Sequence, residues 1–70
     1  MTVRVSINGQ PHELAAGTTL AMAIAGVRGA SDGRGVAAAL DGEVVPRSRW
    51  PDIQLSDGSR VELVVAVQGG

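Results

Sequence analysis

The stretch that decides the fold is the end of the chain, Arg60-Val61-Glu62-Leu63-Val64-Val65-Ala66-Val67-Gln68-Gly69-Gly70. One face of this run is formed by every second residue, namely Val61, Leu63, Val65 and Val67. This alternation predicts a β-strand that lies across a hydrophobic core. Val64 and Ala66 make the opposite face apolar as well, so we expect the strand to be central in its sheet or covered by a partner.

The alternation stops at Gln68, and Gly69 and Gly70 end the sequence. Because glycine has no β-carbon, a tail of this kind can adopt almost any backbone conformation and enter a narrow channel. We therefore interpret residues 68–70 as a thin, flexible tail whose carboxylate is delivered into the active site of another protein. The alternative is a frayed end without chemical role, since the chain contains 10 glycines in 70 residues.

Composition excludes several classes of protein. Seventy residues predict one domain, residues 1–70. The absence of cysteine rules out disulfides, thiolate metal sites and a cysteine nucleophile. A net charge of −1, with no basic stripe and a single aromatic residue, argues against nucleic-acid binding. No run is long enough to span a membrane and no signal peptide is evident, so we expect a cytoplasmic protein.

The chain begins with the pattern of a β-hairpin. Residues 2–7 alternate apolar and polar side chains, Asn8-Gly9 is typical of a type I′ turn, and residues 10–15 return as a second strand. Pro11 lacks a backbone N–H, which predicts that this second strand lies at the sheet edge. His12 is interpreted as a solvated edge residue, because no nucleophile, second histidine or metal ligand accompanies it.

A short helix is expected next, with Thr19 as its N-cap. Its apolar face follows helical spacing: Leu20, Ala23, Ile24 and Val27. Gly29 is the predicted C-cap, and residues 28–35 are predicted to form a flexible loop.

The second half of the chain predicts another hairpin and a crossover. Residues 36–40 and 43–45 read as strands joined by an Asp41-Gly42 turn. Residues 47–51 then form a basic connection that we expect to be irregular. Its Trp50 is expected to cover the bottom of a small core with the indole N–H facing water, and a contact with a partner protein is the alternative.

This order of elements favours an α+β architecture. One short helix can cover one face of a four- to five-stranded mixed sheet. The first and last strands are the most apolar, which favours placing them side by side and parallel in the sheet centre. The predicted fold is a ubiquitin-like β-grasp with no second helix of comparable length.

The sequence resembles the ThiS family of small sulfur carriers over nearly its whole length. The residues that carry the resemblance are Ala16-Gly17-Thr18-Thr19-Leu20, Val44-Val45-Pro46-Arg47-Ser48-Arg49-Trp50, Leu55-Ser56-Asp57-Gly58-Ser59, Val61-Glu62-Leu63-Val64 and Gly69-Gly70. Two features depart from the family pattern: Ser59 stands where an acid is common, and the helix is unusually apolar. We expect both departures to affect surface detail only.

The resemblance implies a chemistry carried out on Gly70 by partner enzymes. A ubiquitin-activating-type adenylyltransferase would use ATP and Mg²⁺ to convert the Gly70 carboxylate to an acyl-adenylate. Sulfur from a cysteine desulfurase or another donor would replace AMP, and thiazole synthase would accept the sulfur from the Gly70 thiocarboxylate in thiamine biosynthesis. The protein itself would be a cosubstrate and not an enzyme, monomeric when free, with no bound cofactor or metal.

Partner contacts are expected on the apolar back of the last strand and on the basic connection. The residues expected to make them are Val64 and Ala66, with Ala37 and Ala39 beside them, and Arg47, Arg49 and Trp50. Alternatives with the same tail are the small subunit of molybdopterin synthase and a carrier or protein modifier of another pathway. A β-grasp interaction module with an incidental Gly-Gly end is the remaining alternative.

Overall fold

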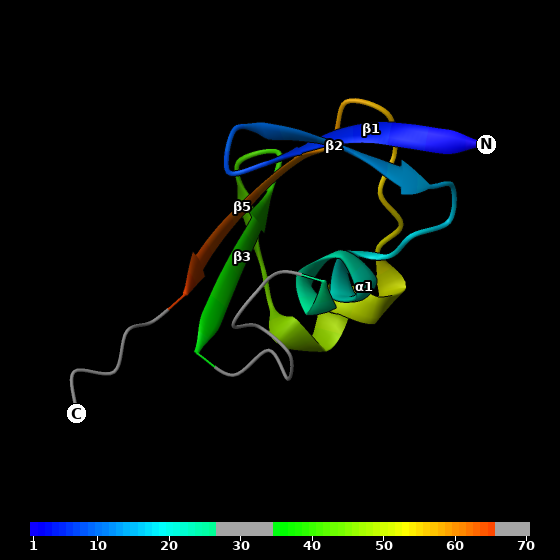
Figure 1. The fold of residues 1–70 in the computed structure, drawn as a ribbon. Helices are drawn as coiled ribbons and strands as arrows, with labels where there is room; N and C mark the ends of the chain where they lie inside the picture. Colours follow the sequence, from blue (N-terminus) through cyan, green and yellow to red (C-terminus); the bar gives the residue numbers. More distant parts are fainter. Residues whose placement is uncertain (27–34, 66–70) are drawn as a thin grey trace.

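The structure, a computed structural model, describes residues 1–26 and 35–65, with the backbone alone at position 65. In this part of the chain, a mixed sheet packs against a layer made of one α-helix and one 3₁₀ helix (Figure 1). The elements are β1 (Thr2–Ile7), β2 (Gln10–Ala15), α1 (Leu20–Ala25), β3 (Val36–Leu40), β4 (Glu43–Val45), η1 (Arg47–Asp52) and β5 (Arg60–Val65). The two hairpins are therefore found at the predicted positions.

The described strands form a five-stranded sheet in the order β2-β1-β5-β3-β4. β1 and β5 pair in parallel at the centre, whereas the other neighbouring strands are antiparallel. Pro11 lies on the edge strand β2, where a missing N–H breaks no ladder. The predicted β-grasp arrangement is confirmed. β5 is the central strand, with β1 and β2 on one side and β3 and β4 on the other.

The first residue of each hairpin turn makes two hydrogen bonds to β5, one from its backbone N–H and one to its side-chain oxygen. Asn8 and Asp41 adopt positive φ angles of 52° and 50°, which short polar side chains tolerate. The Asn8 N–H donates to the Val61 carbonyl at 2.9 Å, and its side-chain Oδ1 accepts from the Leu63 N–H at 2.8 Å. On the other side of β5, the Asp41 N–H donates to the Arg60 carbonyl at 2.8 Å and its Oδ1 accepts from the Arg60 N–H at 3.0 Å. The turn residues therefore fix the position of β5 as well as reversing the chain.

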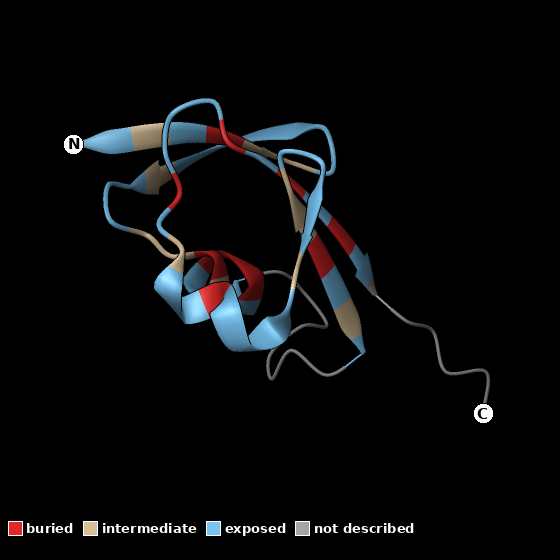
Figure 2. Ribbon diagram, turned by 180° about the vertical axis from the view of Figure 1, so that it is seen from behind, coloured by how far each residue is buried: buried red, intermediate tan, exposed pale blue. Residues whose placement is uncertain are grey.

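The core lies between the inner face of the sheet and the helical layer (Figure 2). Its buried hydrophobic residues are Val5, Leu20, Ala23, Ile24, Ala38, Trp50, Leu55, Val61 and Leu63. Trp50 comes from η1 and Leu55 from the segment between η1 and β5. The other seven residues occupy the inward positions of the strands and the inward face of α1, as period 2 and period 3.6 require. Burial of aliphatic side chains and one indole therefore stabilises the domain.

The helix begins as predicted and ends earlier than predicted. Thr19 is the N-cap, and its Oγ1 accepts from the Met22 N–H at 3.2 Å. The helix ends at Ala25 with Gly26 as its C-cap, three positions before the predicted C-cap Gly29. Glycine costs about 1 kcal/mol relative to alanine inside a helix, which favours a stop at the first glycine. Val27 and Gly29 lie outside the described residues.

The expectation of an irregular connection after β4 was wrong. Residues 47–52 form η1, a 3₁₀ helix as long as α1. The Arg49 N–H donates to the Pro46 carbonyl at 2.8 Å, an i→i+3 bond that suits a short helix containing Pro51. The single-helix expectation missed this element because its pattern contains too few residues for a helical period.

Trp50 anchors η1 in the core. The side chain is 4% exposed, so the prediction that it covers the core is confirmed. The prediction that its indole N–H faces water was wrong, because Nε1 donates to the Val45 carbonyl at 2.9 Å. A buried N–H needs such a partner, and the end of β4 supplies it.

Ser59 is also buried, at 6% exposed, so its departure from the family pattern is not a surface detail. Its Oγ accepts from the Ser56 N–H at 3.0 Å, and its carbonyl accepts from the Ser6 N–H at 2.9 Å. Ser59 therefore organises the turn that leads into β5.

Candidate functional site

The candidate site is β5, the sheet face around it and the tail that follows it. β5 pairs with β1 only through Ser6–Arg60 and Ile7–Val61, but with β3 as far as the Val36–Val65 pair. It therefore continues past the end of β1 toward the C-terminus (Figure 1). The predicted tail residues Gln68, Gly69 and Gly70, and the predicted contact residue Ala66, lie outside the described residues.

An apolar surface lies on the outer face of the sheet, opposite the helical layer. Val64 is 67% exposed and pairs with the exposed Ala37 on β3. Ala39, half-buried on β3, pairs with Val44 on β4, which is 79% exposed. We call these residues, Ala37, Ala39, Val44 and Val64, the outer apolar patch.

The patch surrounds a shallow hollow of about 250 Å³. Small alanine side chains on β3 form its floor, and the larger Val44 and Val64 stand on either side. Glu62 also lines the hollow, next to Val64 on the same face of β5. The predicted apolar back of the last strand is therefore present in the described residues, with Val64 in it.

The other half of the outer face is polar. β1 and β2 present Thr2, Arg4, Ser6 and Glu13 there, around a second, larger hollow. Apolar surface that is exposed and contiguous marks interaction sites more often than polar surface does. The half formed by β3, β4 and β5 is therefore the candidate docking surface.

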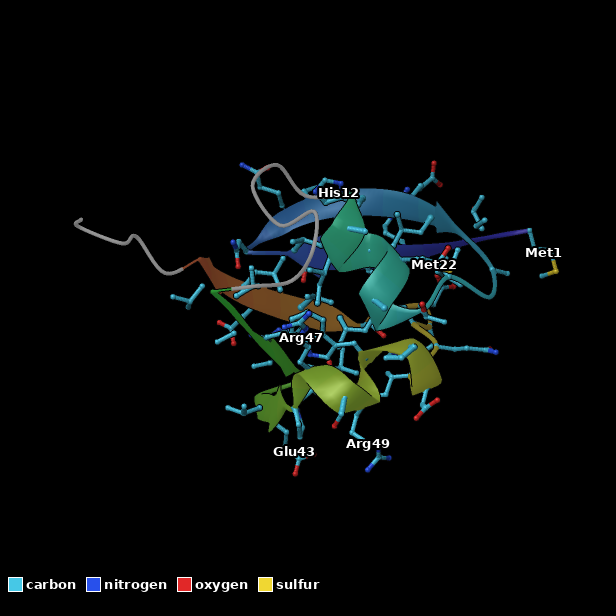
Figure 3. All side chains as sticks on the ribbon, turned by 90° about the horizontal axis from the view of Figure 1, so that it is seen from below. Met1, His12, Met22, Glu43, Arg47 and Arg49 are labelled. Carbon is cyan, nitrogen blue, oxygen red and sulfur yellow. The ribbon has the colours of Figure 1, made fainter. Side chains whose placement is uncertain are left out.

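The two arginines predicted to contact partners lie on a different layer from Val64. Arg47 and Arg49 are exposed on η1, which lies beside α1 (Figure 1). Arg49 lines a separate hollow of about 230 Å³ beside β4, and it projects on the same side of the molecule as Glu43 (Figure 3). Val44, a member of the outer apolar patch, lines both hollows, so the patch adjoins the hollow that Arg49 lines.

Trp50 offers almost no surface to a partner, because its side chain is buried in the core. The alternative role predicted for Trp50, contact with a partner protein, is therefore not supported, and its role is structural. Its burial positions the flanking Arg49, which remains exposed.

The described residues offer no other constellation of reactive side chains. His12 is exposed on β2, as expected for a solvated edge residue. Within residues 1–26 and 35–65, no group of three or more His, Asp or Glu side chains is placed to hold a metal ion. No helix in the same ranges is long and apolar enough to cross a membrane.

Two members of the surface were missed from the sequence. Val44 was assigned to a strand without being assigned to a face, and Glu62 was recognised only as part of a family motif. The Asp41-Gly42 turn contained the missing signal, because a two-residue hairpin turn sets the strand register. That register places Val44 opposite Ala39. The pairing of Ala39 with Glu62 belongs to β3 and β5 and is not set by this turn.

Comparisons with known proteins agree with this geometry. The model of the ThiS family matches residues 5–70. The fold is similar to the crystal structure of a thiamine biosynthesis protein (ThiS) from Geobacter metallireducens, with a TM-score of 0.78 and 24% sequence identity over 97% of this chain and 100% of that chain. No curated protein sequence matches significantly. Because the family model covers nearly the entire sequence, the chain belongs to the ThiS family of ubiquitin-like sulfur carriers.

Proposed function

We propose that the protein carries sulfur as a thiocarboxylate on Gly70 and donates it to thiazole synthase in thiamine biosynthesis. The Gly70 carboxylate attacks ATP in the active site of a ubiquitin-activating-type adenylyltransferase, which forms an acyl-adenylate and releases pyrophosphate. Adenylation replaces a poor leaving group by a good one, so a sulfur nucleophile can then displace AMP from the acyl carbon. The nucleophile is a persulfide supplied by a cysteine desulfurase or an equivalent donor, and its attack forms an acyl disulfide at Gly70. A thiol of the partner enzymes then cleaves the S–S bond, which releases the Gly70 thiocarboxylate and leaves that thiol in a disulfide.

The observation that carries the proposal is the placement of β5. This strand is central in the sheet, is held by Asn8 on one side and Asp41 on the other, and continues past β1 toward Gly69-Gly70. A strand fixed in this way supplies a defined starting point for the tail, so docking of the domain determines where the tail can reach. Membership of the ThiS family supports the same role.

Docking is assigned, within this proposal, to the outer apolar patch. It adjoins the C-terminal half of β5 and is exposed at Val44 and Val64. A partner that covers it gains the free energy of removing apolar surface from water, about 25 cal/mol per Å². Arg47 and Arg49 are proposed as peripheral contacts, where exposed charges influence association rate more than affinity.

In this account the protein is a cosubstrate, and ATP and Mg²⁺ belong to the adenylyltransferase. We place it in the cytoplasm, with the biosynthetic enzymes that it would serve, and as a monomer between encounters. The enzyme that accepts the sulfur distinguishes thiazole biosynthesis from other pathways whose carriers have a similar tail. The match to the ThiS family favours thiazole synthase over the molybdopterin synthase catalytic subunit.

Two assays test the proposal. The adenylyltransferase should catalyse exchange between ATP and labelled pyrophosphate only when this protein is present, and deletion of Gly70 should abolish the exchange. The thiocarboxylate form should then support thiazole formation by thiazole synthase. Transfer of its sulfur to a molybdopterin precursor, without thiazole formation, would refute the assignment to thiamine biosynthesis.

A further inference from the structure

One charged side chain lines the hollow that the outer apolar patch surrounds. Glu62 lines the hollow between Ala37, Ala39, Val44 and Val64. It is exposed, and it projects from the central strand and not from the edge of the sheet. Any surface that covers the patch must therefore also cover the Glu62 carboxylate.

The carboxylate has no partner in the described part of the chain. Neither a hydrogen bond nor an ion pair joins it to any residue within 1–26 or 35–65. Arg60 lies two positions earlier on the same face, and its backbone N–H and carbonyl bond to Asp41. In the free protein, water solvates Glu62.

Docking changes this solvation. A carboxylate that loses water without gaining a hydrogen-bonded cation weakens binding, because removal of a charge from water is costly. Glu62 therefore lowers the affinity for a partner surface that is entirely apolar. A partner surface with a cation opposite Glu62 avoids this penalty and binds more tightly. Glu62 thus makes the surface selective for one kind of partner.

We infer that Glu62 is a specificity-determining residue of the docking surface, and that the adenylyltransferase places an arginine or lysine side chain against it within an otherwise apolar contact. The inference rests on the proposed function, because in that function the adenylyltransferase is the first enzyme that the protein must dock with. It adds the chemistry of the partner surface: apolar side chains around one cation complementary to Glu62.

The test measures binding of the purified adenylyltransferase to wild-type protein and to two variants, Glu62→Gln and Glu62→Val. Loss of one member of a desolvated charge pair should raise Kd about 30-fold or more in both variants. The matched control is Glu43→Gln, which removes an exposed acid that lines the neighbouring hollow and not the patch. The control should change Kd less than about threefold, as exposed peripheral charges do. The unfolding midpoint of each variant, followed by Trp50 fluorescence, establishes that the fold is intact.

Ionic strength separates a central pair from general electrostatic attraction. The loss caused by Glu62→Gln should persist at about 0.5 M NaCl, because a desolvated pair is screened much less than an exposed one. Equal or tighter binding of either Glu62 variant would overturn the inference, because it would show that no cation meets Glu62. Concentration-dependent dimerisation of the wild type that is lost in Glu62→Gln would also overturn it, by identifying a second copy as the occupant.

The outcome for the proposed function is distinct. If the wild-type protein supports pyrophosphate exchange and the Glu62 variants bind with unchanged affinity, the carrier role stands. The inferred cation opposite Glu62 is then refuted. Absence of both binding and exchange with wild-type protein refutes the carrier role, and the inference falls with it.

Discussion

A single change made on the two faces of β5 tests the assignment of core and docking surface. Val61 and Val64 are separated by three positions, so they lie on opposite faces of the strand. Val61 is 1% exposed, whereas Val64 is 67% exposed. Replacement of each valine by aspartate therefore places the same carboxylate once in the core and once in the outer apolar patch.

The expected stability losses differ several-fold. Val61→Asp forfeits about 1.5–3 kcal/mol of side-chain burial and adds several kcal/mol for a desolvated carboxylate. A chain of 70 residues has a total stability of only about 3.5–10 kcal/mol, so this variant should not fold. Val64→Asp loses about a third of the valine burial term, or about 0.5–1 kcal/mol, and up to about 1 kcal/mol of strand preference. It should fold, with Tm lowered by about 5–15 °C.

Val64→Asp, which should fold, is expected to bind the adenylyltransferase much more weakly than the wild type. A carboxylate in the centre of a desolvated apolar contact should weaken binding to the adenylyltransferase by at least about 2 kcal/mol, or about 30-fold in Kd. The matched control is Thr2→Asp, which adds a carboxylate to the polar half of the same sheet face. This control should bind as wild type does. Urea unfolding, followed by far-UV circular dichroism and by the fluorescence of Trp50, measures stability, and calorimetric titration measures Kd.

Two results would refute the reasoning. If Val64→Asp unfolds as completely as Val61→Asp, the assignment of Val64 to an exposed face is wrong. If Val64→Asp folds and binds the adenylyltransferase with wild-type affinity, the outer apolar patch is not the docking surface.

Three further changes test separate parts of the account. Trp50→Phe removes the indole donor to the Val45 carbonyl and opens a small cavity, so the free energy of unfolding should fall by about 2–4 kcal/mol; a loss below about 0.5 kcal/mol in urea titration would contradict the hydrogen bond. Asn8→Ala removes the acceptor for the Leu63 N–H and leaves alanine at positive φ, so it should cost about 2 kcal/mol, and unchanged stability would show that the turn does not hold β5. Gly69→Ala should leave Tm within about 2 °C of wild type but slow adenylation at least tenfold, because a β-carbon restricts and widens the tail; wild-type pyrophosphate exchange by this variant would argue against a narrow channel.

The fold was predictable from the sequence where local chemistry and global topology agree. Asn8-Gly9 and Asp41-Gly42 are strong hairpin signals, because both central residues of a type I′ turn require positive φ. Alternation in β5 separates Val61 and Leu63 from Val64, and the structure places them on the expected faces. Patterns of period 2 bounded by tight turns were therefore sufficient for the strands and hairpins, and the apolar character of the first and last strands indicated their central parallel pairing.

The features that were missed depend on tertiary contacts. η1 has no periodic pattern of its own, and its form follows from the insertion of Trp50 into the core and its bond to Val45. Burial of Ser59 likewise depends on its bonds to Ser6 and Ser56. The Ser56 bond is local to the turn, but the bond to Ser6 joins Ser59 to a distant strand, which local sequence does not indicate.

The candidate site was predictable only in part. Val64 could be assigned to an outward face by alternation, but the hollow beside it requires the register that brings Val44 and Ala39 together. Arg47 and Arg49 were predicted on the basic connection, and the structure places this connection, as η1, in the helical layer. The chemistry of Gly70 rests on the family and stays a prediction.

The most direct test of the central claim is the intact mass of the protein after incubation with the adenylyltransferase, ATP, Mg²⁺, a cysteine desulfurase and cysteine. Exchange of one oxygen for sulfur at the acyl carbon of Gly70 should raise the mass by about 16 Da. The increase should map to the C-terminal peptide and be absent without ATP. An unchanged mass under conditions that sustain pyrophosphate exchange, or an equal increase in protein that lacks Gly70, would contradict the account.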